Sequence, residues 1–309
     1  MGGGQAGAVA AMTGSAETLR PRLGREPPSA SPMRAVTYHA RMQTRNGARE
    51  LGLIVATLAA LSRFVADAPL WVTTALAAVV AIAGTASLVG ELRPWRWPLD
   101  RVALPATAAF VSIGIARLVD PVPWLAVAFA GSWAITAWVV SVEIAAATRG
   151  GRPGSVMPDG THARPTSARL GAFGLAFLGF VAIGGIVPGG VAGDGQPLTV
   201  AAFLATIVLD VAIGGLAGYR IAAVRPHTPG QAVVAFYQYS MVVAPIGVLV
   251  RVLALPRLFG PAVLALATYL VTSLRESEEP VRFNARLLEE TGVLVLAGVA
   301  VVVLGLLVK

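Results

Sequence analysis

The chain has 309 residues, of which 56% are hydrophobic and only 13% are charged, and its formal net charge is +8. An ordinary soluble domain carries about 25% charged residues, and a soluble fold of this size could not bury so much apolar surface in one core. The sequence contains no cysteine, which excludes disulfides, thiolate nucleophiles and zinc–thiolate sites.

The first segment, residues 1–49, is rich in Gly, Ala, Ser, Pro and Arg and shows no apolar periodicity. This composition predicts a disordered, basic tail. Its arginines would attract anionic lipid at about 1 kcal/mol per charge near a membrane surface. Retention of positive charge in the cytoplasm explains the same residues more simply.

Nine apolar segments follow, and a helix needs about 20 apolar residues to cross a bilayer. They lie near residues 51–67, 70–90, 102–119, 122–148, 170–190, 198–219, 231–254, 258–274 and 290–308. We therefore predict an all-α fold, in which residues 50–309 form a polytopic transmembrane helix bundle of about nine helices.

The connections between these segments alternate in character. Those at 91–101, 149–169, 220–230 and 275–289 are longer, and together with the tail they hold 19 of the 24 basic residues. Positively charged segments remain in the cytoplasm, so we predict a cytoplasmic N-terminus, four helical hairpins, a ninth helix and an external C-terminus. The basic residues are almost all arginine, which indicates a GC-rich bacterial genome and hence the bacterial plasma (inner) membrane.

One internal similarity links the first two hairpins. The segments SRFVADAPLW (62–71) and ARLVDPVPWL (116–125) both contain Arg, an apolar pair, Asp, Pro and Trp in that order. Either the hairpins are repeats, or tight turns of one kind select the same residues. The sequence leaves both interpretations open.

Three arginines, Arg63, Arg117 and Arg251, lie one or two turns from the predicted external surface. Together they could hold an anion such as a lipid phosphate. The simpler interpretation is a set of local salt bridges that end the helices, because Asp67 follows Arg63 by four residues and Asp120 follows Arg117 by three. Arg251 has no such neighbour.

The sixth segment carries one acid, Asp210, in an otherwise apolar stretch. Residues three, four, seven and eight positions away share its helical face. All of them are small: Ala202, Thr206, Gly214, Ala217 and Gly218. We therefore expect Asp210 to face a neighbouring helix, approached closely through the G-x-x-x-G pair. It serves either as an ion, proton or substrate site or as a hydrogen-bonding contact between helices.

A second acid, Glu143, follows Ser132 and Thr136 on one face of the fourth segment. This polar stripe could line a hydrated path. The simpler interpretation, which we favour, is that Glu143 lies within two turns of the cytoplasmic end and reaches water there.

The seventh segment contains the polar run Tyr237, Gln238, Tyr239 and Ser240, followed by Pro245. A proline inside a helix frees a backbone carbonyl and favours a kink. Broken, polar helices form the binding sites of many transporters. We predict that Tyr237–Ser240 and Arg251 line one internal face, although prolines and interfacial tyrosines are also ordinary in membrane helices.

Several classes of site are disfavoured. His39, His162 and His227 lie outside the apolar segments, so we expect no metal, no cofactor and no catalytic serine–histidine pair. Nucleic-acid binding needs a basic face on a folded soluble module, and none is visible.

The favoured hypothesis is a membrane transporter or binder of a small or lipidic solute, with a polar pocket between helices six and seven. Its candidate residues are Asp210, Tyr237, Gln238, Tyr239, Ser240, Arg251 and Glu143. The expected partners are the lipid bilayer, an anionic lipid or small solute, and other membrane proteins. One alternative is a non-catalytic membrane subunit or assembly factor, whose polar residues would be used in helix–helix hydrogen bonds. A second is a membrane-embedded lipid-modifying enzyme, which would need convergent acids that the sequence does not clearly offer.

Overall fold

The computed structural model describes residues 32–65, 67–90, 99–120, 122–148, 165–187, 199–223, 229–256, 258–277 and 285–308. Within these ranges the chain is all-helical. The α-helices are α1 (Pro32–Ser62), α2 (Asp67–Gly90), α3 (Leu99–Leu118), α4 (Leu125–Thr148), α5 (Pro165–Ile186), α6 (Val200–Ala223), α7 (Pro229–Val252), α8 (Phe259–Ser277) and α9 (Ala285–Leu307), with a short 3₁₀ helix η1 (Val122–Trp124) before α4. The predicted all-α class and the nine helical segments are confirmed for the described residues.

The first helix begins earlier than we predicted. We expected residues 1–49 to form a disordered tail, but α1 starts at Pro32, so residues 32–49 are helical, and residues 1–31 lie outside the described ranges. Proline suits the first position of a helix, and the following residues include the helix formers Ala, Met, Gln and Arg without an early glycine. The chain divides into two compact units, Met1–Arg41 and Met42–Lys309, and the remaining description concerns the second.

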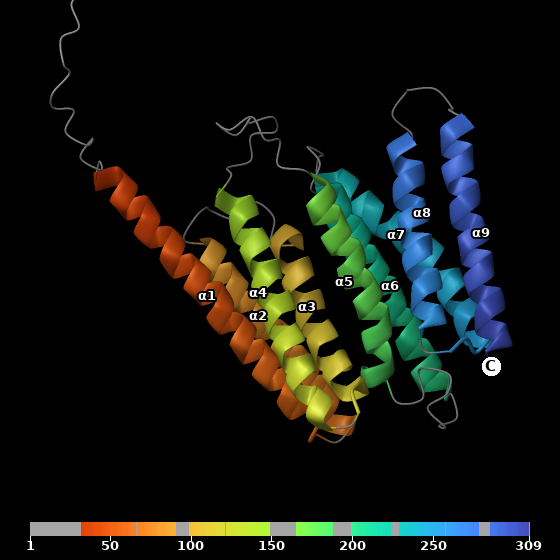
Figure 1. Cartoon of the computed structure of the whole chain (residues 1–309), viewed down its shortest axis with the longest axis horizontal. Coiled ribbons are helices and arrows are strands. Elements are labelled where there is room, and N and C mark those ends of the chain that lie inside the picture. Colours follow the sequence, from red (N-terminus) through yellow and green to blue (C-terminus); the bar gives the residue numbers. More distant parts are fainter. Residues whose placement is uncertain are drawn as a thin grey trace, which may run out of the picture. The chain divides into compact units, whose positions relative to one another are not determined.

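Successive helices of this unit run in alternating directions (Figure 1). The C-terminal ends of α1, α3, α5 and α7 lie on one side of the bundle, which we call the Asp120 end. The C-terminal ends of α2, α4, α6 and α8 lie on the opposite side, which we call the Arg220 end. The C-terminus is at the Asp120 end (Figure 1), where Gly305 of α9 approaches Phe259 and Leu255.

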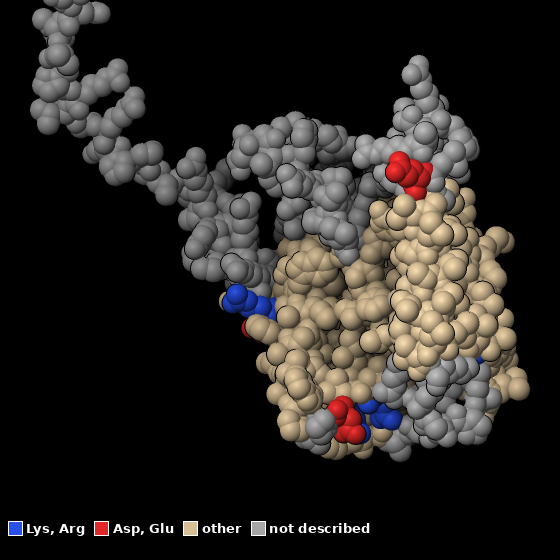
Figure 2. Space-filling view, turned by 45° about the vertical axis from the view of Figure 1, so that its right-hand side comes forward, with Lys and Arg blue, Asp and Glu red and all other residues tan. Residues whose placement is uncertain are grey.

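Four of the described helical segments are long and apolar enough to cross a membrane. They are Leu70–Val89, Leu125–Ile144, Val200–Ala223 and Gly230–Val252. Shorter apolar helices occupy 103–118, 171–186, 259–275 and 292–307. A broad uncharged surface separates the charged groups near the two ends of the bundle on the face drawn in Figure 2. These features fit a membrane protein.

Helix α3 lies at the centre of the packing, in contact with α2, α4, α5 and α6. Small side chains make close approach possible, and alanines contribute much of the core. The tightest crossing joins α3 to α5, where Gly114 meets the backbone of Ala182 and Gly185 meets the backbone of Gly114. A β-carbon at either glycine would overlap main-chain atoms of the other helix.

Candidate functional site

Asp210 is fully buried between α6 and α7, and it forms an ion pair with Arg251. The guanidinium Nη2 of Arg251 lies 3.3 Å from one carboxylate oxygen and 3.5 Å from the other. Both side chains are almost inaccessible, at 0% and 6% of their full exposure. The expectation that Asp210 faces a neighbouring helix is therefore confirmed, and the partner is the arginine for which the sequence offered no neighbour.

A glycine creates the space for this pair. Helical side chains point back toward the N-terminus, so Arg251 extends over the residue one turn earlier, Gly247. A β-carbon at Gly247 would lie 3.1 Å from the carboxylate of Asp210. The end of α7 is held just beyond this point by a C-terminal capping motif, in which Ala254 has φ 48° and Leu255 donates to the carbonyl of Val250 at 3.3 Å.

The rest of the α6–α7 interface is closely packed. Three glycines of α6 leave room for side chains of α7. Val243 packs against Gly214, Phe236 and Ser240 pack against Gly215, and the ring of Tyr239 packs against Gly218. Ser240 also donates a hydrogen bond of 3.4 Å to the carbonyl of Val211. The predicted close approach through Gly214 and Gly218 is confirmed, and the described side chains fill this interface.

The polar run of α7 does not line one internal face. Four consecutive residues span about 300° of a helix, so they cannot all point the same way. Tyr239 is buried, and its hydroxyl lies 2.5 Å from that of Thr272 on α8. Ser240 faces α6, whereas Tyr237 is 61% exposed and Gln238 is also exposed. The prediction of a shared internal face is wrong for Tyr237 and Gln238.

Glu143 forms a second buried ion pair, with Arg220 of α6. Their closest nitrogen and oxygen atoms are 2.8 Å apart, and the side chains are 1% and 9% exposed. We favoured access of Glu143 to water, and this prediction is wrong. The two residues meet because each lies within about two turns of the Arg220 end of its helix, in α4 and α6 respectively.

Arg220 was missed by the sequence analysis, which assigned it to a cytoplasmic connection. The sequence did contain a signal for this pair. An acid lies near the end of one apolar segment and a base lies near the corresponding end of another, so both would be at a similar depth in a membrane. Helix α6 thus carries two buried charges, Asp210 and Arg220, and each pairs with a different helix. Burial of a charge requires such a partner.

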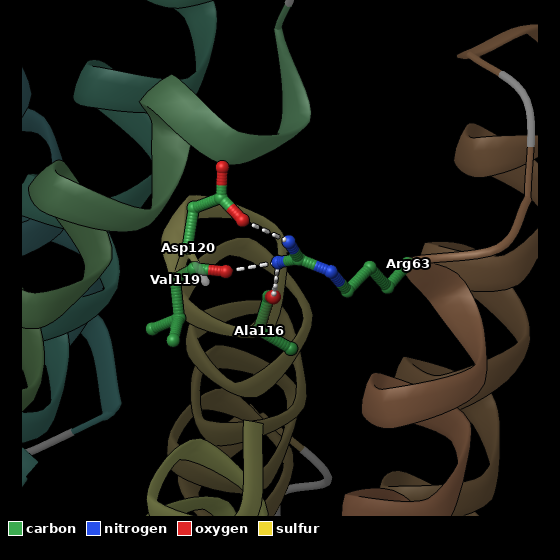
Figure 3. A network of polar contacts seen from close by, with 4 residues as sticks. All are labelled: Arg63, Ala116, Val119 and Asp120. Carbon is green, nitrogen blue, oxygen red and sulfur yellow. Dashed lines mark hydrogen bonds and ion pairs between the residues drawn. The ribbon is translucent and has the colours of Figure 1, made fainter. Parts of the chain in front are cut away.

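Arg63 and Arg117 cross-link the Asp120 ends of α1 and α3. Arg63 donates to the carbonyls of Ala116 and Val119 and pairs with Asp120 at 2.8 Å (Figure 3). The acid that pairs with Arg63 therefore follows α3, whereas the predicted partner was the local acid Asp67. The side chain of Asp67 lies outside the described residues.

Arg117 reaches in the opposite direction. It donates to the carbonyls of Ser62 and Val65, both at 2.8 Å, and to that of Gly185 at 3.1 Å. Cations stabilise the free carbonyls at helix C-termini. The arginines of the two similar segments thus play reciprocal roles. Arg63, at the end of α1, caps the end of α3, and Arg117, at the end of α3, caps the end of α1.

A cavity of about 440 Å³ lies between α3, α4 and α5. It is lined by Val111, Ser112, Ile115, Leu118, Val119, Asp120, Trp124, Val127, Ala128, Gly131, Ser132, Ile135 and Leu178. Its walls are mainly aliphatic, and the hydroxyl of Ser112 is already bonded to the carbonyl of Ala108. Ser132 of the predicted polar stripe contributes to this cavity, while Glu143 does not.

The chain matches no family model, no curated protein and no solved structure. Within the described residues, no group of three or more His, Cys, Asp or Glu side chains is placed to hold a metal ion. In the part of the chain that the structure describes, the geometry therefore offers two buried ion pairs that join helices and an apolar cavity between α3, α4 and α5.

Proposed function

We propose that the chain is a multi-pass integral membrane protein of the bacterial plasma membrane, which binds or transports a lipidic solute in the cavity between α3, α4 and α5. The observation that carries this proposal is the volume and lining of that cavity. Ligand sites typically have 300–1,000 Å³ and are mostly apolar, with a few polar groups. The cavity has about 440 Å³ and an aliphatic wall, with Asp120 and Trp124 at one end.

This proposal moves the binding site away from helices six and seven. Asp210 and Arg251 form an ion pair there, and α7 side chains occupy the space above the glycines of α6. A ligand would have to separate these helices before it could reach Asp210. The α3–α4 cavity needs no such rearrangement.

Gly131→Leu should abolish labelling of the cavity by a fatty alcohol that carries a photoactivatable diazirine. Gly131 lines the cavity, and a β-carbon there would meet no described atom within 4 Å. The leucine side chain therefore enters free space instead of the protein core, and leucine is a better helix former than glycine. Labelling is measured on the full-length protein in lipid nanodiscs, by mass spectrometry of peptides from α3 and α4.

Gly174→Leu is the matched control, because Gly174 on α5 is exposed and also has free space for a β-carbon among the described residues. It should label as the unmodified protein does. Equal labelling of α3 and α4 in both variants, or its absence in the unmodified protein, would contradict the proposed site.

We propose a topology with a cytoplasmic N-terminus and an external C-terminus, which places the Asp120 end outside. The distribution of basic residues supports it. Alkaline phosphatase fused after Lys309 should be active, because the enzyme folds only outside the cytoplasm, and a fusion within residues 150–168 should be inactive. Fusions to a cytoplasmic reporter at the same positions provide the control, and the reverse pattern would reject this orientation.

A non-catalytic subunit or assembly factor is the second candidate function. It is favoured by the two ion pairs, Asp210–Arg251 and Glu143–Arg220, since both use intramembrane charges to join helices. On this hypothesis the cavity would be filled by bulk lipid without selectivity. If long-chain alcohols of every length displace the diazirine probe equally, the result would support this second function over specific solute binding.

A further inference from the structure

The mouth of the α3–α4 cavity carries a carboxylate and an aromatic ring. The side chain of Asp120 is 83% exposed, and that of Trp124 is 58% exposed. Both residues line the cavity at the point where its aliphatic wall ends. A ligand that fills the cavity would therefore place its outer end beside these two groups.

The charge of Asp120 is only partly engaged. Its Oδ1 atom accepts from Arg63 at 2.8 Å, and Figure 3 shows its other oxygen directed away from Arg63. The guanidinium of Arg63 is also directed to the carbonyls of Ala116 and Val119, and its side chain is only 19% exposed. Solvent and ligands at the mouth thus meet the carboxylate more readily than the guanidinium.

One further feature makes this mouth attractive to a cation. The Trp124 ring can bind an ammonium group on its face through a cation–π interaction. Arg117, the other nearby base, is directed to the carbonyls of Ser62, Val65 and Gly185.

We infer that the solute of this cavity is a cationic amphiphile, with an apolar chain against α3 and α4 and an ammonium head group between Asp120 and Trp124. This inference rests on the proposed function and specifies its substrate class. An apolar tail would contact only the wall of the cavity, whereas an ammonium head group would also meet the exposed carboxylate and ring that border it.

The test uses competition with the diazirine fatty alcohol in nanodiscs that contain the full-length chain. The three competitors are decyltrimethylammonium, decyl phosphate and decanol, which share a chain and differ in charge. The cation should displace the probe at a concentration about tenfold lower than decanol does, since the carboxylate and the ring each add a few-fold in affinity. Equal potency of the three competitors, or greater potency of the phosphate, would overturn the inference.

Paired variants separate the carboxylate from its ion pair. Asp120→Asn should remove about fivefold of the preference for the cation. Arg63→Gln breaks the same ion pair but leaves the carboxylate, so it should preserve or increase that preference. An equal loss in both variants would mean that the pair only shapes the mouth, and it would overturn the assignment of Asp120.

Trp124→Leu should weaken the cation about threefold and leave decanol unchanged, whereas Trp71→Leu, at an exposed tryptophan outside the cavity lining, should change neither. A loss for decanol as large as that for the cation would reject the cation–π contact.

Failure of the probe to label the cavity at all would reject the proposed function itself. Labelling without a preference for the cation would reject only the present inference.

Discussion

An Asp210→Leu chain is expected to lose about 3–5 kcal/mol of stability, because the change leaves Arg251 buried without its partner. The carboxylate is fully buried and lies 3.3 Å from the guanidinium. A leucine would also contact Gly247, the position that makes room for the pair. The loss should appear as a lower midpoint of thermal unfolding for the purified protein in detergent.

A double-mutant cycle distinguishes the ion pair from simple packing. Arg251→Leu alone should be similarly destabilising, since it leaves Asp210 as the unpaired charge. The combined Asp210→Leu and Arg251→Leu chain should recover most of the stability, because apolar replacement of both partners is often neutral. If the two losses simply add, Asp210 and Arg251 do not stabilise one another.

Asp210→Asn keeps the shape and an acceptor oxygen for Arg251 but removes the opposite charge, so it should lower the thermal midpoint less than Asp210→Leu does. An ion- or proton-coupled role would make this variant fold but leave it unable to bind or transport its solute, because an amide does not exchange charge. Retained binding by the Asn variant would assign Asp210 to helix packing alone.

Gly114→Leu should prevent accumulation of the folded protein. The α3 and α5 backbones touch at this position, where Gly114 meets the main chain of Ala182. No rotamer of a side chain avoids this overlap, because it begins at the β-carbon, and separation of the helices would also open the contact at Gly185. The measurement is the monodisperse fraction in size-exclusion chromatography after detergent extraction.

Gly174→Leu again serves as the control, since it inserts the same side chain into an apolar helix without a neighbouring atom among the described residues. It should give the yield and elution of the unmodified protein. A normal yield for Gly114→Leu would show that α3 and α5 do not cross where the structure places them.

Helix positions and the buried face of Asp210 were predictable from the sequence, but the partner of Asp210 was not. Apolar runs located the helices because burial and lipid select the same residues, and small neighbours identified the face of Asp210 as an interface. The identity of Arg251 as its partner depends on the rotation of α7, which periodicity does not determine. For the same reason Tyr237 and Gln238 were wrongly predicted to face inward.

The cavity could not be predicted, because it depends on how three helices pack against one another. Its lining combines residues of α3, α4 and α5 that share no sequence pattern. Gly131 and Ser132 are also ordinary in a membrane helix, and only the space around Gly131 distinguishes it from the glycines that pack against neighbouring helices. The start of α1 was missed for a different reason, since its first turns are polar and carry no apolar period.

The reciprocal arginines of the first two hairpins have a consequence for biogenesis. When the ribosome has delivered α1 and α2, Arg63 still lacks acceptors that lie 53–57 residues further along the chain. Ser62 and Val65 likewise wait for Arg117, 55 and 52 residues later. In the proposed bilayer, the first hairpin would therefore remain at the insertion machinery or at the lipid head groups until α3 arrives. The first two hairpins would leave the translocon together, as a single insertion unit.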